Sequence, residues 1–233
     1  MLSTITRALR RQSTAEKVPN YHSELKVLLE RAKEFADCGN KHALEDLQRL
    51  VLRPIQSRHM VDAYLKEDHK AVDSFHEWNH IGLYMIPSLQ KTFIDHVLEH
   101  RLDKETLPTA KLGRDIVLPT CWHPSSIMNV LGNIGEGRKS SPWEQDPNHK
   151  LHYWFPLNIF WVGGGNHSIT QGIVLAEGEV KACEGYNLSK LYQHVRFDGE
   201  HWIDLHDGVK LGTPRYKELG YVYEIGRFLI EVA

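Results

Sequence analysis

The sequence has few cysteines, no long hydrophobic run and almost no net charge. Its three cysteines, Cys38, Cys121 and Cys183, lie far apart and form no Cys-x-x-Cys pair, which argues against a disulfide framework and a zinc-thiolate site. We interpret them as buried thiols of a protein in a reducing compartment. No apolar run approaches the roughly 18 residues that a membrane span needs. We therefore expect a soluble, cytoplasmic protein with no membrane partner.

The charge balance also limits the range of partners. The 233 residues include 28 basic and 30 acidic side chains, so no global field draws the molecule to nucleic acid or anionic lipid, and any basic site must be local. The first fifteen residues are an exception, because they carry arginines and no acid. A mitochondrial presequence would share this pattern, but we favour a frayed basic arm or a short docking helix.

The pattern of apolar residues divides the chain into a helical lobe at residues 1–105 and an α+β domain at residues 106–233. In the lobe, apolar residues recur at helical spacing, Gly39-Asn40 ends a first helix and Pro54 stops a second. The helices predicted there cover residues 25–35, 41–52, 55–65, 70–85 and 89–102.

Prolines and glycines break the second half into short elements. The predicted strands cover residues 116–118, 153–162 with an interruption near Pro156, 179–183, 195–197 and 201–203. The predicted helices cover residues 124–134, 168–176, 188–193 and 214–232, and residues 135–150 read as a long polar loop. Together these elements predict an α+β fold, in which the helical lobe packs on a small mixed sheet and a C-terminal helix closes the structure.

A glycine-rich turn joins a predicted strand to a predicted helix at Gly163-Gly164-Gly165-Asn166-His167-Ser168. In this arrangement backbone N–H groups point at one spot with the helix dipole behind them, which favours an anion. Glycine permits positive φ and lets a phosphate approach the backbone. We expect Asn166 to cap the helix, and His167 and Ser168 to contact the anion. The alternative is that the glycines merely allow a sharp reversal of the chain.

The stretch from Phe155-Pro156-Leu157 to Ser168 resembles the ParB/sulfiredoxin-like superfamily, and the resemblance covers about residues 117–192. In that superfamily a strand leads into a Gly-x-His-Arg or Gly-Asn-His-Arg turn that binds nucleotide phosphates. The resemblance implies that a nucleotide such as ATP binds at residues 163–168 and that His167, Asn166 and Ser168 are catalytic. Ser168 replaces the family's arginine, so Arg138, or else Lys139 or Arg196, is expected to supply the missing charge.

The resemblance implies a ligand class before it implies a reaction. We expect a phosphate- or nucleotide-binding protein, with nucleotide hydrolysis or nuclease activity in bacterial defence or mobile-element biology as the reaction that the resemblance suggests. Nucleic acid and a second copy of the chain are further candidate partners. A non-catalytic interaction module is the alternative.

A histidine motif suggests a metal-dependent hydrolase instead, although a second motif of opposite polarity nearby argues against it, since a protein needs only one such site. His76-Glu77-Trp78-Asn79-His80 matches His-Glu-x-x-His, in which two histidines one helical turn apart bind a divalent metal and the glutamate activates water. The segment from His96 to His100 matches the reversed motif, His-x-x-Glu-His. A metal site without protease activity at His76, His80, His96 or His100, and helix-surface histidines without a metal, are the alternatives.

Overall fold

The computed structural model describes residues 23–65 and 84–232, and the structural statements below refer to these residues. The basic segment of residues 1–15 and the metal ligands predicted at His76, Glu77 and His80 lie outside them. So does all but the end of the helix predicted over residues 70–85. None of the described helices is long and apolar enough to cross a membrane.

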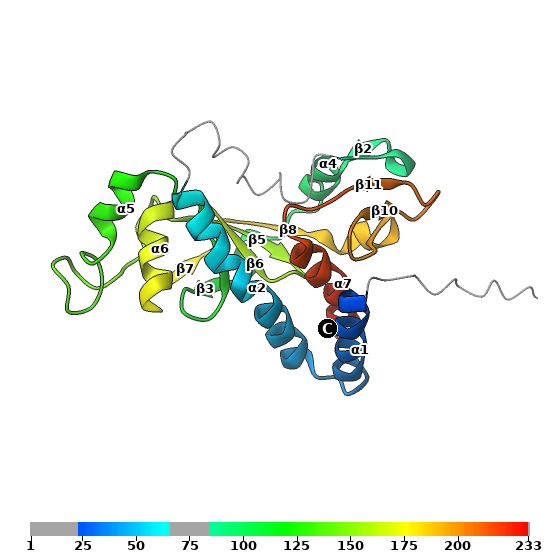
Figure 1. Cartoon of the computed structure of the whole chain (residues 1–233), viewed down its shortest axis with the longest axis horizontal. Coiled ribbons are helices and arrows are strands. Elements are labelled where there is room, and N and C mark those ends of the chain that lie inside the picture. The colour runs from blue at the N-terminus through cyan, green and yellow to red at the C-terminus, as the bar shows by residue number, and fades with distance from the viewer. Residues whose placement is uncertain (1–22, 66–83, 233) are drawn as a thin grey trace, which may run out of the picture.

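The N-terminal helices α1 (Ser23–Asp37) and α2 (Lys41–Tyr64) pack on each other and on the C-terminal helix α7 (Lys217–Glu231) (Figure 1). Gly39 has a φ of +65°, and the Asn40 side chain accepts a hydrogen bond from the amide of Ala43 at 3.0 Å. The predicted boundary between these two helices is thus confirmed, with Asn40 as the N-cap of α2.

The predicted stop at Pro54 is wrong, because α2 continues through it to Tyr64. A proline inside a helix costs about 3 kcal/mol. The buried face of α2 runs on past the proline with Ile55, and the Gln56 side chain donates to the carbonyl oxygen of Val117 at 2.8 Å. We attribute the uninterrupted helix to this packing on the sheet, which outweighs the local preference.

The central sheet is mixed, as predicted, and has the strand order β4-β6-β5-β8. β4 is parallel to β6, β6 is antiparallel to β5, and β5 is parallel to β8. Its strands are β4 (Ile116–Leu118), β6 (Ile159–Gly164), β5 (Lys150–Phe155) and β8 (Glu184–Asn187). The strand predicted over residues 153–162 is therefore a pair of antiparallel strands that turn at Pro156.

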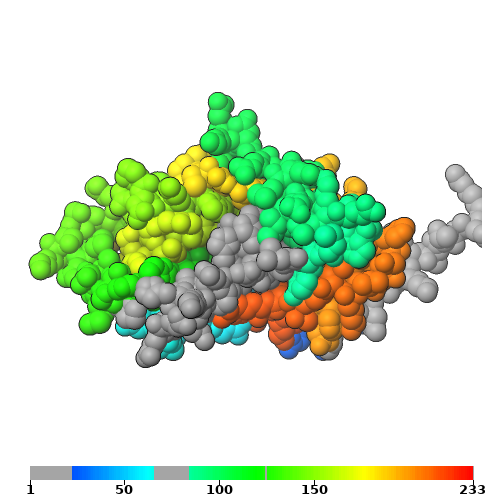
Figure 2. All heavy atoms as spheres, turned by 90° about the horizontal axis from the view of Figure 1, so that it is seen from above, coloured from blue at the N-terminus to red at the C-terminus, as the bar shows by residue number. Residues whose placement is uncertain are grey.

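Three smaller sheets accompany the central one in the part of the chain that the structure describes. Their antiparallel strand pairs are β1 (Met85–Ile86) with β2 (Lys91–Thr92), β3 (Thr109–Lys111) with β7 (Glu179–Lys181), and β10 (Trp202–Asp204) with both β9 (Val195–Phe197) and β11 (Lys210–Gly212). Figure 2 shows the segment that contains β1 and β2 beside the segment that contains β11. The hairpin predicted around Asp198-Gly199 is confirmed by the pairing of β9 with β10.

The short helices differ most from the prediction. The helix predicted over residues 89–102 is the shorter α4 (Phe93–Leu98), which begins at a capping box between Thr92 and Asp95. The helix predicted over residues 124–134 is α5 (Pro124–Val130). The remaining short helices are η2 (Pro87–Leu89), η3 (Lys104–Thr106) and η4 (Leu188–Gln193).

Of the three cysteines predicted to be buried, only Cys121 is; Cys38 and Cys183 are exposed.

The largest hydrophobic core draws on both predicted domains. It contains Leu25 and Leu52 from the N-terminal helices together with Trp154 from β5 and Val222 from α7, all fully buried. A second core lies around Phe160, on the opposite face of the central sheet. The division at residues 105 and 106 stays a prediction, but side chains from both sides of it share one interior.

Candidate functional site

The glycine-rich turn lies where β6 ends and α6 (Asn166–Leu175) begins, so the predicted order of strand, turn and helix is confirmed. Gly165 occupies the N-cap position with a φ of +76°, and no side chain caps the helix. Among the described residues, no acceptor takes a hydrogen bond from the amides of Asn166, His167 and Ser168. These are the first-turn N–H groups that a helix leaves unsatisfied, and they carry its positive dipole end.

The three glycines also have a packing role. A Cβ at Gly165 would lie 2.2 Å from Cδ2 of His149, and one at Gly164 would lie 2.5 Å from the carbonyl oxygen of Asn148. A Cβ at Gly163 would meet the His152 ring at 2.9 Å. The residues that precede and form β5 therefore press against the turn. This contact accounts for the glycines without any ligand.

Asn166 does not cap α6, contrary to the prediction. A residue inside the first turn cannot serve as N-cap, and Gly165 holds that position. The Asn166 side-chain oxygen instead accepts a hydrogen bond from the amide of Thr120 at 2.6 Å. Asn166 thus joins the start of α6 to the segment that follows β4.

The Ser168 hydroxyl is held by two partners. It lies 2.6 Å from Nε2 of His149 and donates to the carbonyl oxygen of Gly165 at 3.1 Å. Nδ1 of His149 accepts from the amide of Asp146 at 2.8 Å, so the proton of a neutral ring is on Nε2 and points at Ser168. His149 is therefore a donor to Ser168 and not a base that would take its proton.

His149 is fixed by its surroundings. Its ring is 5% exposed and stacks on Trp143, with ring centres 4.8 Å apart and planes at 19°. The Trp143 indole in turn donates to the carbonyl oxygen of Ser168 at 2.6 Å. Burial lowers the pKa of His149, although Asp146 acts in the opposite direction. The predicted polar loop thus contributes two aromatic rings that hold the first turn of α6.

Of the three predicted catalytic residues, His167 keeps a side-chain nitrogen available for a ligand. Its Nε2 accepts a hydrogen bond from the amide of His123 at 3.3 Å, so Nδ1 carries the proton of the neutral ring. Within the described residues, Nδ1 has no hydrogen-bond partner. Burial, with a smaller contribution from His123, lowers the pKa of His167, which favours the neutral form near pH 7.

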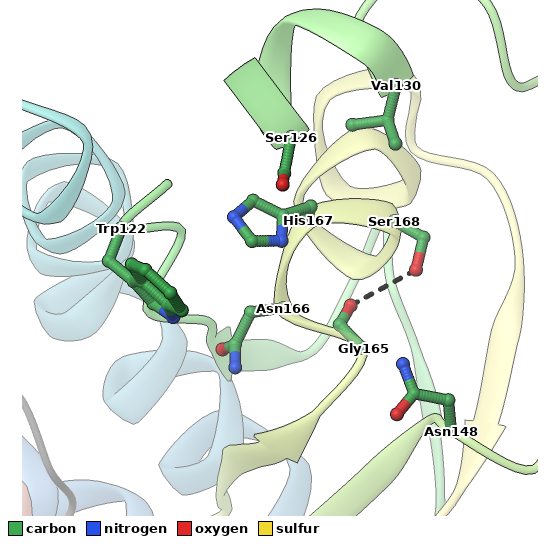
Figure 3. A pocket seen from close by; sticks show the side chains of 8 residues that line it. All are labelled: Trp122, Ser126, Val130, Asn148, Gly165, Asn166, His167 and Ser168. Atoms are coloured by element: carbon green, nitrogen blue, oxygen red, sulfur yellow. Dashed lines mark hydrogen bonds between the residues drawn. The ribbon is translucent and has the colours of Figure 1, made fainter. Parts of the chain in front are cut away.

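A cavity of about 370 Å³ opens beside these groups. Figure 3 shows the His167 ring between Ser126 on one side and Asn166 on the other, with the Trp122 indole near its outer edge. The ring centres of Trp122 and His167 are 6.3 Å apart. The lining residues are Trp122, Ser126, Val130, Asn148, Gly165, Asn166, His167 and Ser168. The cavity thus combines donors from the helix start with one aromatic face.

The predicted cationic residues are not in this cavity. Arg138 lies near Gly132 and Gly135, and Gly135 also packs against Leu175 at the opposite end of α6. That end is about 12 Å from the first turn, at 1.5 Å of rise per residue. Arg196 is in β9, which belongs to a different sheet. Neither arginine, nor Lys139, is among the lining residues.

Four of the eight lining residues, including Asn148, were not among the predicted site residues. Trp122, Ser126 and Val130 come from the segment that follows β4 and from α5, which the parallel pairing of β4 with β6 brings beside the turn. The segment 142–149 did carry a usable signal, because it belongs to a long polar loop and such loops are often functional. The position of α5 left no local trace in the sequence.

Fold and site together define an α+β protein with an open helix N-terminus at the wall of a polar cavity. Over residues 5–233 the sequence matches the family described as "Family of unknown function (DUF6710)", and the chain belongs to that family. Comparisons with curated proteins and with solved structures gave no match.

Proposed function

We propose that this protein binds a phosphate-bearing small molecule, and specifically a nucleotide, at the start of α6. The observation that supports the proposal is the set of amides of Asn166, His167 and Ser168, which donate to no described acceptor at the wall of a 370 Å³ cavity. Such amides, backed by a helix dipole of about half a positive charge, bind the oxygens of a phosphate.

The other lining residues suit a ligand that has an uncharged part besides its phosphate. No lysine or arginine is among the lining residues that the structure describes, so the attraction for the anion comes from the helix start and from the Nδ1 proton of His167. The Trp122 indole presents an aromatic ring on which a nucleobase can stack. The resemblance of the turn to nucleotide-binding turns points to the same class of ligand.

The contacts of Asn166 and Ser168 favour binding over catalysis. Both side chains are engaged in holding the turn, through Thr120 and His149 respectively. Nucleotide hydrolysis, nuclease activity and a role in bacterial defence or mobile-element biology stay predictions, as does binding of nucleic acid. The metal-dependent hydrolase predicted at His76, Glu77 and His80 lies outside the described residues.

The test is calorimetric titration of the protein with inorganic phosphate, AMP and ATP. We expect all three to bind, with AMP and ATP tighter than phosphate. Val130→Glu places a negative charge in the cavity wall and should weaken phosphate binding about fivefold, from about 1 kcal/mol of repulsion in water. Val174→Glu is the matched control, because Val174 is on α6, is 60% exposed and does not line the cavity.

Two further variants separate the two ends of the ligand. Trp122→Ala should weaken AMP binding and leave phosphate binding unchanged, whereas His167→Ala should weaken both. If the parent protein binds none of the three compounds, or if Val130→Glu and Val174→Glu have equal affinities, the proposal is wrong.

A further inference from the structure

Three histidines gather away from the glycine turn, where α4 contacts η4. His96 is in α4, His100 follows that helix, and His194 follows η4. The ring centre of His96 lies 4.7 Å from that of His100 and 5.8 Å from that of His194. His96 and His100 belong to the reversed motif of the sequence, and His194 was not predicted. Figure 1 shows α4 beside the sheet that contains β10.

The central ring of this cluster has an unmet hydrogen-bonding group. His96 is 8% exposed, and its Nε2 is buried without a hydrogen-bond partner among the described residues. Leaving a buried polar atom unpaired costs about 1–3 kcal/mol, so such an atom indicates a missing ligand or water.

The second ring is already in the tautomer that a metal ion needs. Nδ1 of His100 lies 2.8 Å from the carbonyl oxygen of His96, and a carbonyl can only accept, so Nδ1 carries the proton. The lone pair of a neutral His100 is therefore on Nε2. A backbone carbonyl that holds one ring nitrogen of a histidine is the usual outer contact of a metal-binding imidazole.

We propose that His96, His100 and His194 bind a divalent transition metal ion, with zinc as the best fit. Two imidazoles on one tetrahedral ion, with metal–nitrogen bonds of about 2.0–2.1 Å, place their ring centres about 5 Å apart, close to the two spacings observed here. Three neutral imidazoles suit zinc, copper and nickel and not calcium or magnesium. Glu99 lies nearby but is paired with Lys91 at 2.7 Å, so water and not Glu99 completes the coordination shell.

The site closes when the ion binds. In the side-chain positions of the structure, no group of three or more His, Cys, Asp or Glu among the described residues could hold a metal ion. His194 is only partly buried and can turn toward the ion, whereas His96 is buried and His100 is held by the carbonyl oxygen of His96.

The experiment uses the full chain without a polyhistidine tag, stripped of metal with a chelator. Titration with Zn²⁺ by calorimetry, and with Co²⁺ by visible absorption, should show one equivalent bound and a cobalt spectrum typical of tetrahedral nitrogen ligands. Zn²⁺ should also raise the thermal unfolding midpoint. His100→Gln and His194→Gln should each lower the affinity about tenfold or more, as expected for the loss of one ligand.

Two controls give the result its meaning. His206→Gln changes an exposed histidine outside the cluster and should bind Zn²⁺ like the parent protein. His80→Gln should do the same. The proposal is overturned if the parent protein binds no Zn²⁺, if His100→Gln and His194→Gln bind it normally, or if His80→Gln alone abolishes binding. His96→Gln is a secondary variant, and the two partly exposed positions keep the test valid should it fail to fold.

Discussion

Adding a single methyl group at Gly165 tests whether the turn is held by the contacts described above. Gly165→Ala puts a side chain on a backbone with a φ of +76°, which costs about 1–2 kcal/mol. The new Cβ also lies 2.2 Å from Cδ2 of His149. The His149 ring is stacked on Trp143 and cannot retreat, so overpacking adds about 1–3 kcal/mol. We expect a loss of about 2–5 kcal/mol in the free energy of unfolding.

Urea unfolding followed by tryptophan fluorescence measures this loss. Gly137→Ala is the matched control, because Gly137 has a φ of +70° and a Cβ there would have nothing within 4 Å. It should show the backbone cost alone. The double variant with His149→Ala should lose less than the sum of the two single variants, since removing the ring removes the overlap. If Gly165→Ala costs no more than Gly137→Ala, the inferred packing of His149 on the turn is wrong.

Three further predictions concern the rest of the molecule. Arg227→Ala removes the ion-pair partner of the buried Glu224, 2.7 Å away, and should lower the free energy of unfolding measured in urea by about 3–5 kcal/mol. Arg31→Ala removes one member of an exposed pair and should change it by less than about 1 kcal/mol. Asn40→Ala should cost about 1 kcal/mol in the same assay, through loss of the cap on α2. Burial lowers the pKa of His149 and His167 below the ordinary 6.5, so the unfolded chain takes up protons before the folded chain as the pH falls through that value. The urea midpoint of unfolding should therefore drop between about pH 7 and about pH 5. A midpoint that rises on acidification would contradict this.

Local signals in the sequence were sufficient for much of the fold. The strand at Ile116–Leu118, the helix boundary at Gly39-Asn40 and the hairpin at Asp198-Gly199 were predicted from short patterns and are confirmed. Pro54 was misjudged because the contacts that keep α2 intact, such as that of Gln56 with the distant Val117, join residues far apart in the chain. Local propensity cannot reveal such contacts.

The same distinction applies to the candidate site. The turn and the start of α6 were predicted from glycines that follow a strand. The role of Asn166 was misjudged because its partner, Thr120, reaches it only through the pairing of β4 with β6. The imidazole of His149 was not recognised as the support of Ser168, since their separation in sequence hides a contact of 2.6 Å. The reversed histidine motif was visible in the sequence, but its neighbour His194 was not.

Two glutamines of α2 have a consequence for how the protein opens. Gln48 donates to the carbonyl oxygen of Pro156 at 2.8 Å, and Gln56 donates to that of Val117 at 2.8 Å, both from fully buried positions. Lifting α2 away from the strands would leave buried amides and carbonyls without partners at once. Amide protons of α2 and β4 should therefore exchange with solvent in one cooperative event, and neither half of the chain should persist as a stable fragment when the other is cut away.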